Sequence, residues 1–271
     1  MSQVDPKTYW EERLRRDFDL RGVGFHGLGG PYNAWMYRVR RRIFRRLAAE
    51  LAPQPASVEV LDVGSGTGFY IDCWRELGVT RIAGVDLTEV AVARLTARFP
   101  GLDFRRLDIA GEIPQEWRGR FDVVSAFDVF IHVLDDHAYQ RALANVAALL
   151  KPDGRFVFSE TFLHAPTQRW HHGVNRSLAD IEDSLARAGL RITRRGPMFV
   201  LMNDPGDTRG PVWRALWSWL TLPLRFNRRV GMVTGYLLGA LLYPLELALT
   251  AVKSEGPSTE FAICRKTGSP G

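Results

Sequence analysis

The chain has 271 residues, of which 46% are hydrophobic and 24% charged, and this composition excludes a disordered protein. The length fits one large α/β domain with additions, or two small domains. The net charge of +6 permits a nucleic acid or anionic lipid partner without favouring a fold. Cys73 and Cys264 lack the spacing of a metal site, so we expect reduced thiols in a cytosolic protein. The N-terminus has no apolar core, and no signal peptide is expected.

The first 55 residues are expected to form an N-terminal helical cap. Hydrophobic periodicity predicts helices over residues 7–21 and 32–51, joined by a glycine-rich link at 22–30. The second predicted helix has an apolar face, and its other face carries six arginines between positions 38 and 46. Such a charged face is usually solvated, but it also fits a surface for anionic headgroups.

Strands and helices alternate regularly from Val58 onward. Strands are predicted at 58–63, 81–86, 103–107, 121–127, 155–160 and 190–201, and helices at 70–77, 89–99, 136–150 and 178–188. Short links between them indicate a mainly parallel sheet with helices on both faces. We expect this domain to span 56–271, with an interruption at 205–257 and a last strand at 258–265.

A glycine-rich turn follows the first predicted strand. Gly64, Gly66 and Gly68 stand at alternate positions directly before a predicted helix. Glycine lacks a Cβ, so the backbone can turn tightly and a ligand can lie against it. The order of strand, glycine turn and helix is typical of a nucleotide site at the carboxyl end of a parallel strand.

Three acids fall at the ends of successive strands: Asp62, Asp86 and Asp108. Asp86 lies about twenty residues beyond the glycines, where a carboxylate can accept hydrogen bonds from both ribose hydroxyls. A dinucleotide site is disfavoured, because the Gly-x-Gly-x-x-Gly spacing is missing. Asp62 would also repel a pyrophosphate, whereas it suits a ligand with an amino group and a nearby positive charge, such as S-adenosylmethionine.

The sequence here resembles the class I S-adenosylmethionine-dependent methyltransferases. The segments that carry the resemblance are 61–68, 84–88, 107–109, 121–132 and 149–155. The resemblance implies a Rossmann-like seven-stranded sheet whose last strand is antiparallel and inserted between strands five and six. It also implies S-adenosylmethionine as cofactor, with the following binding residues: Asp62, Gly64, Ser65, Gly66, Gly68, Asp86, Leu87, Asp108, Ile109 and Phe127.

The implied reaction is an in-line methyl transfer from sulfur to a nucleophile, which requires alignment and exclusion of water. An oxygen nucleophile would benefit from a base near neutral pH, and His132 is our candidate. His132 could instead only line the pocket. We expect no metal. The predicted substrate-binding residues are His26, Tyr32, Trp35, Met36, Phe130, His132 and His164.

The interruption at 205–257 contains two hydrophobic stretches, 211–224 and 231–252. The second is long enough to span a bilayer, but a single crossing would separate two strands that should pair in one sheet. The first stretch is too short to provide a second crossing. We therefore expect an in-plane or re-entrant helical pair, a lid on the domain, or a dimer interface. Tryptophans beside arginines are typical of membrane interfaces.

We therefore predict a methyltransferase of a small, lipophilic acceptor, with O-methylation favoured. Alternatives are methylation of RNA or protein, or a non-catalytic S-adenosylmethionine-binding scaffold. Two further associations are considered: a homodimer, and a peripheral membrane contact through residues 211–252. Binding of nucleic acid is not expected. The predicted location is cytoplasmic, with the inner face of the membrane as the alternative.

Overall fold

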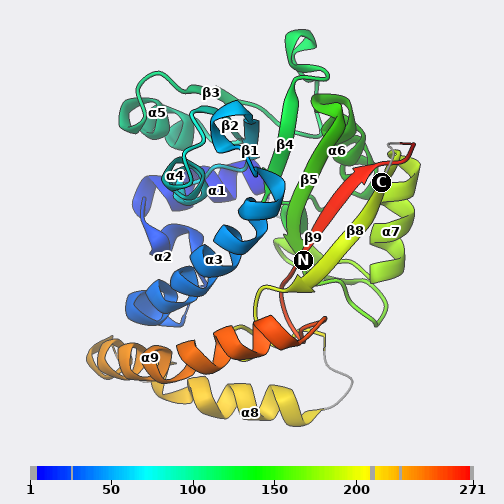
Figure 1. The fold of residues 1–271 in the computed structure, drawn as a ribbon. Helices are drawn as coiled ribbons and strands as arrows, with labels where there is room; N and C mark the ends of the chain where they lie inside the picture. The colour runs from blue at the N-terminus through cyan, green and yellow to red at the C-terminus, as the bar shows by residue number, and fades with distance from the viewer. Residues whose placement is uncertain (1–4, 26, 208–210, 226–227, 269–271) are drawn as a thin grey trace.

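The computed structural model describes residues 5–25, 27–207, 211–225 and 228–268. One sheet of seven strands runs through the molecule in the order β3-β2-β1-β4-β5-β9-β8 (Figure 1). Its strands are β1 (Glu59–Val63), β2 (Arg81–Asp86), β3 (Asp103–Arg106), β4 (Phe121–Ala126), β5 (Leu150–Glu160), β8 (Leu190–Pro197) and β9 (Glu260–Lys266). All neighbours pair in parallel except β9, which is antiparallel to both β5 and β8. The fold class and the inserted antiparallel strand are thus confirmed.

Helices cover both faces of the sheet. The α-helices are α1 (Pro6–Arg16), α2 (Leu20–Val23), α3 (Gly29–Leu51), α4 (Phe69–Glu76), α5 (Glu89–Arg98), α6 (Asp136–Leu149), α7 (Leu178–Arg187), α8 (Pro211–Thr221) and α9 (Arg228–Val252). Short 3-10 turns are η1 (Pro55–Ser57), η2 (Gln115–Trp117), η3 (Phe130–His132) and η4 (Leu222–Arg225). One buried cluster joins α3, α4, α5 and α9 to the sheet, and the other joins α6 and α7 to its opposite face. Side chains along β1 point alternately to the two faces of the sheet, so β1 contributes to both clusters. Val60 belongs to the first cluster, and Leu61 and Val63 belong to the second.

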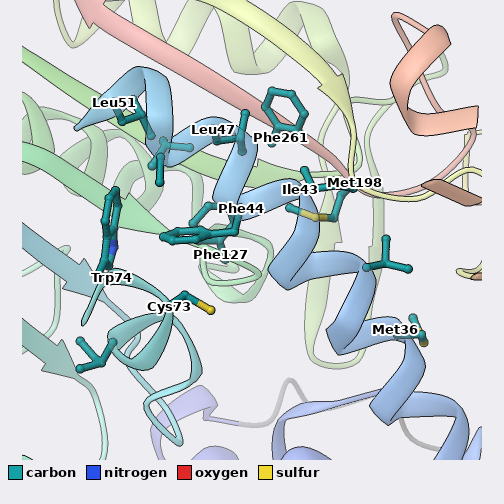
Figure 2. Close-up of a cluster of buried hydrophobic side chains, with 14 of the residues drawn as sticks. Met36, Ile43, Phe44, Leu47, Leu51, Cys73, Trp74, Phe127, Met198 and Phe261 are labelled. Atoms are coloured by element: carbon teal, nitrogen blue, oxygen red, sulfur yellow. The ribbon is translucent and has the colours of Figure 1, made fainter. Parts of the chain in front are cut away.

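Helix α3 lies directly on the sheet. Its Phe44 packs edge-on against Trp74 of α4, with ring centroids 4.7 Å apart, and its ring also contacts Phe127. Figure 2 shows Ile43, Phe44 and Leu47 of α3 pointing toward Phe127, Met198 and Phe261. The helix therefore shares its buried face with the sheet. A boundary at residue 55 between cap and main domain stays a prediction.

The N-terminal helix predicted over 7–21 is broken into α1 and α2. Asp17 ends α1 with an extended backbone, at φ −134°, and its N–H bonds to the Arg13 carbonyl. A Cβ on Gly22 would lie 1.8 Å from the Asp17 carbonyl oxygen, so only glycine allows the chain to fold back here.

Two differences concern β5 and the segment after it. Residues 151–154, which separate the predicted helix 136–150 from the predicted strand 155–160, belong to β5, where the register to β4 shifts between Phe121 and Val123. After β5 a two-stranded hairpin forms from β6 (Gln168–Trp170) and β7 (Gly173–Asn175), which the sequence did not predict. The hairpin lies beside η3 and so contributes to the region after β4.

The interruption predicted at 205–257 lies between β8 and β9 and contains α8, η4 and α9. Figure 1 shows α9 alongside α3, with α8 on the far side of α9 from the sheet. Gly231–Val252 of α9 is long and apolar enough to cross a membrane, and only 17% of its most hydrophobic window is buried. Both ends of the interruption return to the paired strands β8 and β9, as the topological argument requires.

Candidate active site

The glycine turn after β1 is held against the end of β2. Gly64 and Gly66 have φ values of +69° and +51°, in the region that favours glycine. The N–H groups of Gly64 and Ser65 both donate to the carbonyl of Val85, and Gly66 N–H donates to the Asp86 carboxylate at 2.9 Å. A Cβ on Gly64 would lie 2.4 Å from Val129 Cγ2, so a side chain there would collide with the loop after β4.

This turn forms one wall of a partly open cavity at the carboxyl ends of β1, β2 and β4. Most of the predicted cofactor residues line it: Gly64, Ser65, Gly66, Asp86, Leu87, Asp108, Ile109 and Phe127.

Asp86 is buried at the cavity wall, and burial raises its pKa. Its carboxylate accepts the N–H and the hydroxyl of Thr88, at 2.9 and 2.7 Å, in addition to the Gly66 N–H. A carboxylate has about four acceptor positions, so capacity remains for a ligand hydroxyl. Asp108 accepts Ala110 N–H through Oδ1, and Oδ2 has no hydrogen bond within the described residues.

Asp62 and Gly68 lie outside the cavity wall. The Asp62 carboxylate is buried and accepts the Ser125 hydroxyl at 2.7 Å, and burial raises its pKa to about 7. Gly68 instead begins α4, with φ +83°. This geometry does not support the prediction that Asp62 faces the ligand's amino group. The Asp62 side chain lies beneath the glycine turn instead.

His132 lies on the cavity wall, in η3. Its Nδ1 lies 2.9 Å from the carbonyl oxygen of His172 in the turn of the β6–β7 hairpin. Because a carbonyl only accepts, Nδ1 carries the proton and Nε2 keeps its lone pair. Burial lowers the His132 pKa to about 4, so the ring is neutral at pH 7.

Helix α1 covers the same cavity. Pro6, Trp10 and Leu14 are four residues apart, share one helix face and line the cavity. The Trp10 ring meets His132 edge-on at 4.9 Å. The neighbouring Tyr9 stacks on His172 at 5.2 Å. The sequence predicted this helix, but it assigned none of these residues to the site.

An ion pair with one buried partner was also missed. Asp128 follows β4, lines the cavity and has φ +59°, a strained conformation for a residue other than glycine. Its carboxylate lies 2.6 Å from the guanidinium of Arg40, which comes from α3, and also accepts the Ser159 hydroxyl. Tyr70, which stacks on Phe127 at 4.2 Å, completes this wall. No local sequence pattern marks Asp128 or Arg40.

Most of the predicted substrate residues lie elsewhere. Tyr32 and Met36 are buried on the inner face of α3, and Phe130, the first residue of η3, is buried among aromatic residues. Trp35 packs against α9, while His164 bonds to Asp207. His26 falls outside the described residues. Of the six described residues of this set, only His132 lines the cavity, because the other five side chains are taken up by packing or ion pairing.

Comparison with known proteins decides the family. A sequence profile described as a methyltransferase domain matches residues 32–194, more than half of the chain. The chain belongs to this family. The enzyme class inferred from the motifs, S-adenosylmethionine-dependent methyltransferase, and its cofactor are confirmed at this level.

Curated relatives include a ubiquinone biosynthesis O-methyltransferase from Albidiferax ferrireducens. It is 34% identical over 116 residues, which are 41% of this chain and 44% of that protein. The match thus spans less than half of the relative's length. Among solved structures, the CcbJ methyltransferase from Streptomyces caelestis covers 98% of this methyltransferase and 100% of its own chain, at 15% identity and a TM-score of 0.56.

A second solved structure is the 1,6-didemethyltoxoflavin-N1-methyltransferase of Burkholderia thailandensis, with bound 1,6-didemethyltoxoflavin and S-adenosylhomocysteine. It is 24% identical, with a TM-score of 0.52, and covers 73% of this chain and 86% of that chain. These structural likenesses show a common fold. A fold alone does not identify the acceptor, which must come from the site.

Proposed function

We propose that this enzyme transfers the methyl group of S-adenosylmethionine to an oxygen of a small, lipophilic acceptor. The observation that carries the proposal is the shared cavity, in which the glycine turn and Asp86 lie opposite a wall formed by Trp10, Leu14 and His132. The donor and an apolar acceptor would meet there, enclosed by α1.

The residues present fit S-adenosylmethionine. Gly64 and Gly66 have no side chain at the cavity wall, and Asp86 retains acceptor capacity for a ribose hydroxyl. The apolar Leu87 and Ile109 flank the place where an adenine ring would lie, and the free Oδ2 of Asp108 would accept from its amino group. When bound, the cofactor supplies an electrophilic methyl group on a sulfonium sulfur.

We assign His132 the role of general base. The bond from Nδ1 to the His172 carbonyl fixes the ring and leaves Nε2 to accept the hydroxyl proton while the new O–C bond forms. A pKa of about 4 makes His132 a weak base but keeps it unprotonated, so it suits an acceptor whose hydroxyl is itself acidic, such as a phenol. The ion pair between Arg40 and Asp128 fixes the adjoining wall.

Two further observations support this acceptor class. The curated relatives include several ubiquinone biosynthesis O-methyltransferases, although each match is partial. Below α1 the cavity wall also includes Val129 and Val133, which offer no hydrogen-bonding side chain to a polymer backbone. An apolar enclosed wall favours burial of a small apolar molecule over a nucleic acid.

The test combines calorimetry with product analysis. S-adenosylmethionine should bind the full chain, and a panel of phenols should yield methyl ethers, with higher kcat/KM for those that carry an apolar tail. Binding without transfer to any phenol, together with transfer to total RNA or to protein, would reject the acceptor class. No binding of S-adenosylmethionine would reject catalysis itself.

A further inference from the structure

A continuous apolar surface on α8 and α9 is not used by the proposed reaction. The large apolar side chains exposed there are Val212, Trp213, Leu216, Trp219, Leu222, Met232, Val233, Tyr236, Leu237, Leu241, Leu245 and Val252. Elsewhere in the described part of the chain only Trp170 is such a residue. A soluble monomer rarely exposes a contiguous patch of this kind, so we expect an apolar partner to cover this surface.

The opposite face of α9 is fixed to its own domain. Gly235 and Gly239 lie so close to α3 that a Cβ on Gly239 would be 2.3 Å from the Trp35 ring. Farther along, the buried Glu246 carboxylate accepts backbone N–H groups of Val200, Leu201 and Met202. The exposed apolar face therefore cannot be covered by a simple rotation of α9, which would break these contacts.

The segment that carries this surface is mainly basic. Within 211–252 the sequence has four arginines and a single acid, Glu246, whose carboxylate is buried on the inner face. Helices α3 and α9 run side by side in the same direction, with Tyr32 beside Gly235 and Arg46 near Ala251. The apolar strip is thus accompanied by the exposed arginines of α3.

These arginines form a row along α9. Arg38, Arg42 and Arg46 are four residues apart and exposed, and they make no ion pair within the described residues. The Arg38 guanidinium lies 4.0 Å from the centroid of the Trp35 ring, at the α9 contact. Arg46 shares a second cavity, of about 770 Å³, with Lys253 just beyond the end of α9.

We propose that the α8–α9 surface docks onto an anionic lipid bilayer, with both helices in the plane of the interface. Exposed tryptophans beside an apolar strip and an unpaired basic row match a membrane interface with anionic headgroups. A second copy fits less well, since it would bring an identical row of unpaired cations. A single crossing by α9 is excluded because β8 and β9, on either side of the insertion, pair in one sheet. A second crossing is excluded because α8, with 11 residues, is about 17 Å long, against the ~30 Å needed.

The test uses the full chain and vesicles of phosphatidylcholine, with or without phosphatidylglycerol. The protein should sediment with the anionic vesicles, less strongly as salt is raised. Reversing two charges of the row, in Arg42→Glu/Arg46→Glu, should weaken partitioning at least about 30-fold, because each basic residue contributes roughly a factor of five. The matched control is Arg118→Glu/Arg191→Glu, at the amino ends of β4 and β8 and so at the other end of the strands from the insertion, which should bind like the wild type.

The apolar strip is tested by Leu237→Asp/Leu241→Asp, at positions 61% and 72% exposed, which should abolish sedimentation. Calorimetry with S-adenosylmethionine shows whether this variant remains folded. If it does not, brominated lipids provide a second test, since they should quench wild-type tryptophan emission more than that of Trp219→Phe. The proposal is overturned if the wild type ignores anionic vesicles or if both charge-reversal pairs bind alike. It is also overturned if the wild type is a dimer that Leu237→Asp/Leu241→Asp dissociates without affecting vesicle binding.

Discussion

Asp86→Ala should weaken S-adenosylmethionine binding by roughly ten- to a hundredfold. The variant removes the carboxylate whose remaining acceptor position is proposed to take a ribose hydroxyl, and a hydrogen bond to a charged group contributes about 1.5–3 kcal/mol. Losing that bond corresponds to roughly one to two powers of ten in Kd. Isothermal calorimetry with the full chain measures this directly.

The same substitution should also destabilise the fold. Asp86 accepts the N–H of Thr88, a fully buried residue at the start of α5, and an unpaired buried N–H costs about 1–3 kcal/mol. A control with a similar loss of stability is Leu185→Ala on α7, expected to cost about 3 kcal/mol without touching the cavity. If Asp86→Ala lowers Tm like the control but leaves the Kd within threefold of wild type, the ribose assignment is wrong.

Four other substitutions test the remaining features. His132→Gln should lower kcat by about 10²–10⁴-fold with the donor Kd unchanged, and an unaltered kcat would show that His132 is not the base. In the wild type, kcat/KM should not fall until the pH approaches about 4, the His132 pKa. Arg40→Met leaves the partly exposed Asp128 without its cation and should cost about 1–3 kcal/mol in denaturant unfolding. Most of that loss should return in Arg40→Met/Asp128→Asn, and a double variant no better than the single one contradicts the pairing. Glu246→Ala leaves three backbone N–H groups without their acceptor and should cost at least about 3 kcal/mol; a cost under about 1 kcal/mol would show that water replaces the carboxylate. Asp62→Asn should keep donor affinity within threefold, because the Asp62 side chain lies outside the cavity wall. Burial raises the pKa of Asp62 to about 7 in the folded chain. The contribution of this carboxyl to stability is therefore fully present at pH values below its pKa in the unfolded chain, and it is lost as the pH rises toward 7. The asparagine variant should therefore gain stability relative to wild type between pH 5 and 8, and the opposite trend in thermal unfolding would contradict the burial argument.

The sheet and the cofactor wall could be predicted because their determinants are local. Each strand near the glycine turn is a short apolar run with a turn signal at its end, and Asp86 falls at a spacing fixed by one βα unit. The insertion was also located from sequence, since its composition departs sharply from the alternation around it. These features need no knowledge of which distant segments come together.

The acceptor side depends on such distant contacts, which explains the errors there. Helical periodicity identified an apolar face on α3, but it could not tell whether that face meets a substrate or the sheet, and Tyr32 and Met36 proved to be core. The β6–β7 hairpin has strands of only three residues, too short to show alternation. The pairing of Arg40 with Asp128 joins α3 to the end of β4, across 88 positions of sequence.

The contrast between Asp62 and Asp86 shows that position at a strand end is not enough to make an acid a ligand residue. Asp62 has the same parity along β1 as Val58 and Val60, whose side chains belong to the layer beneath α3 and α4. Its carboxylate therefore points into that layer, where Ser125 donates to it and Trp74 in turn donates to Ser125. Asp86 instead ends β2 next to the glycine turn and is reached by the Gly66 N–H from the cavity side. Both acids have the same strand parity, since Asp62 pairs with Gly84, but Asp86 lies two positions nearer the carboxyl edge of the sheet. This depth along the strand separates a carboxylate that supports the turn from one that can meet the donor.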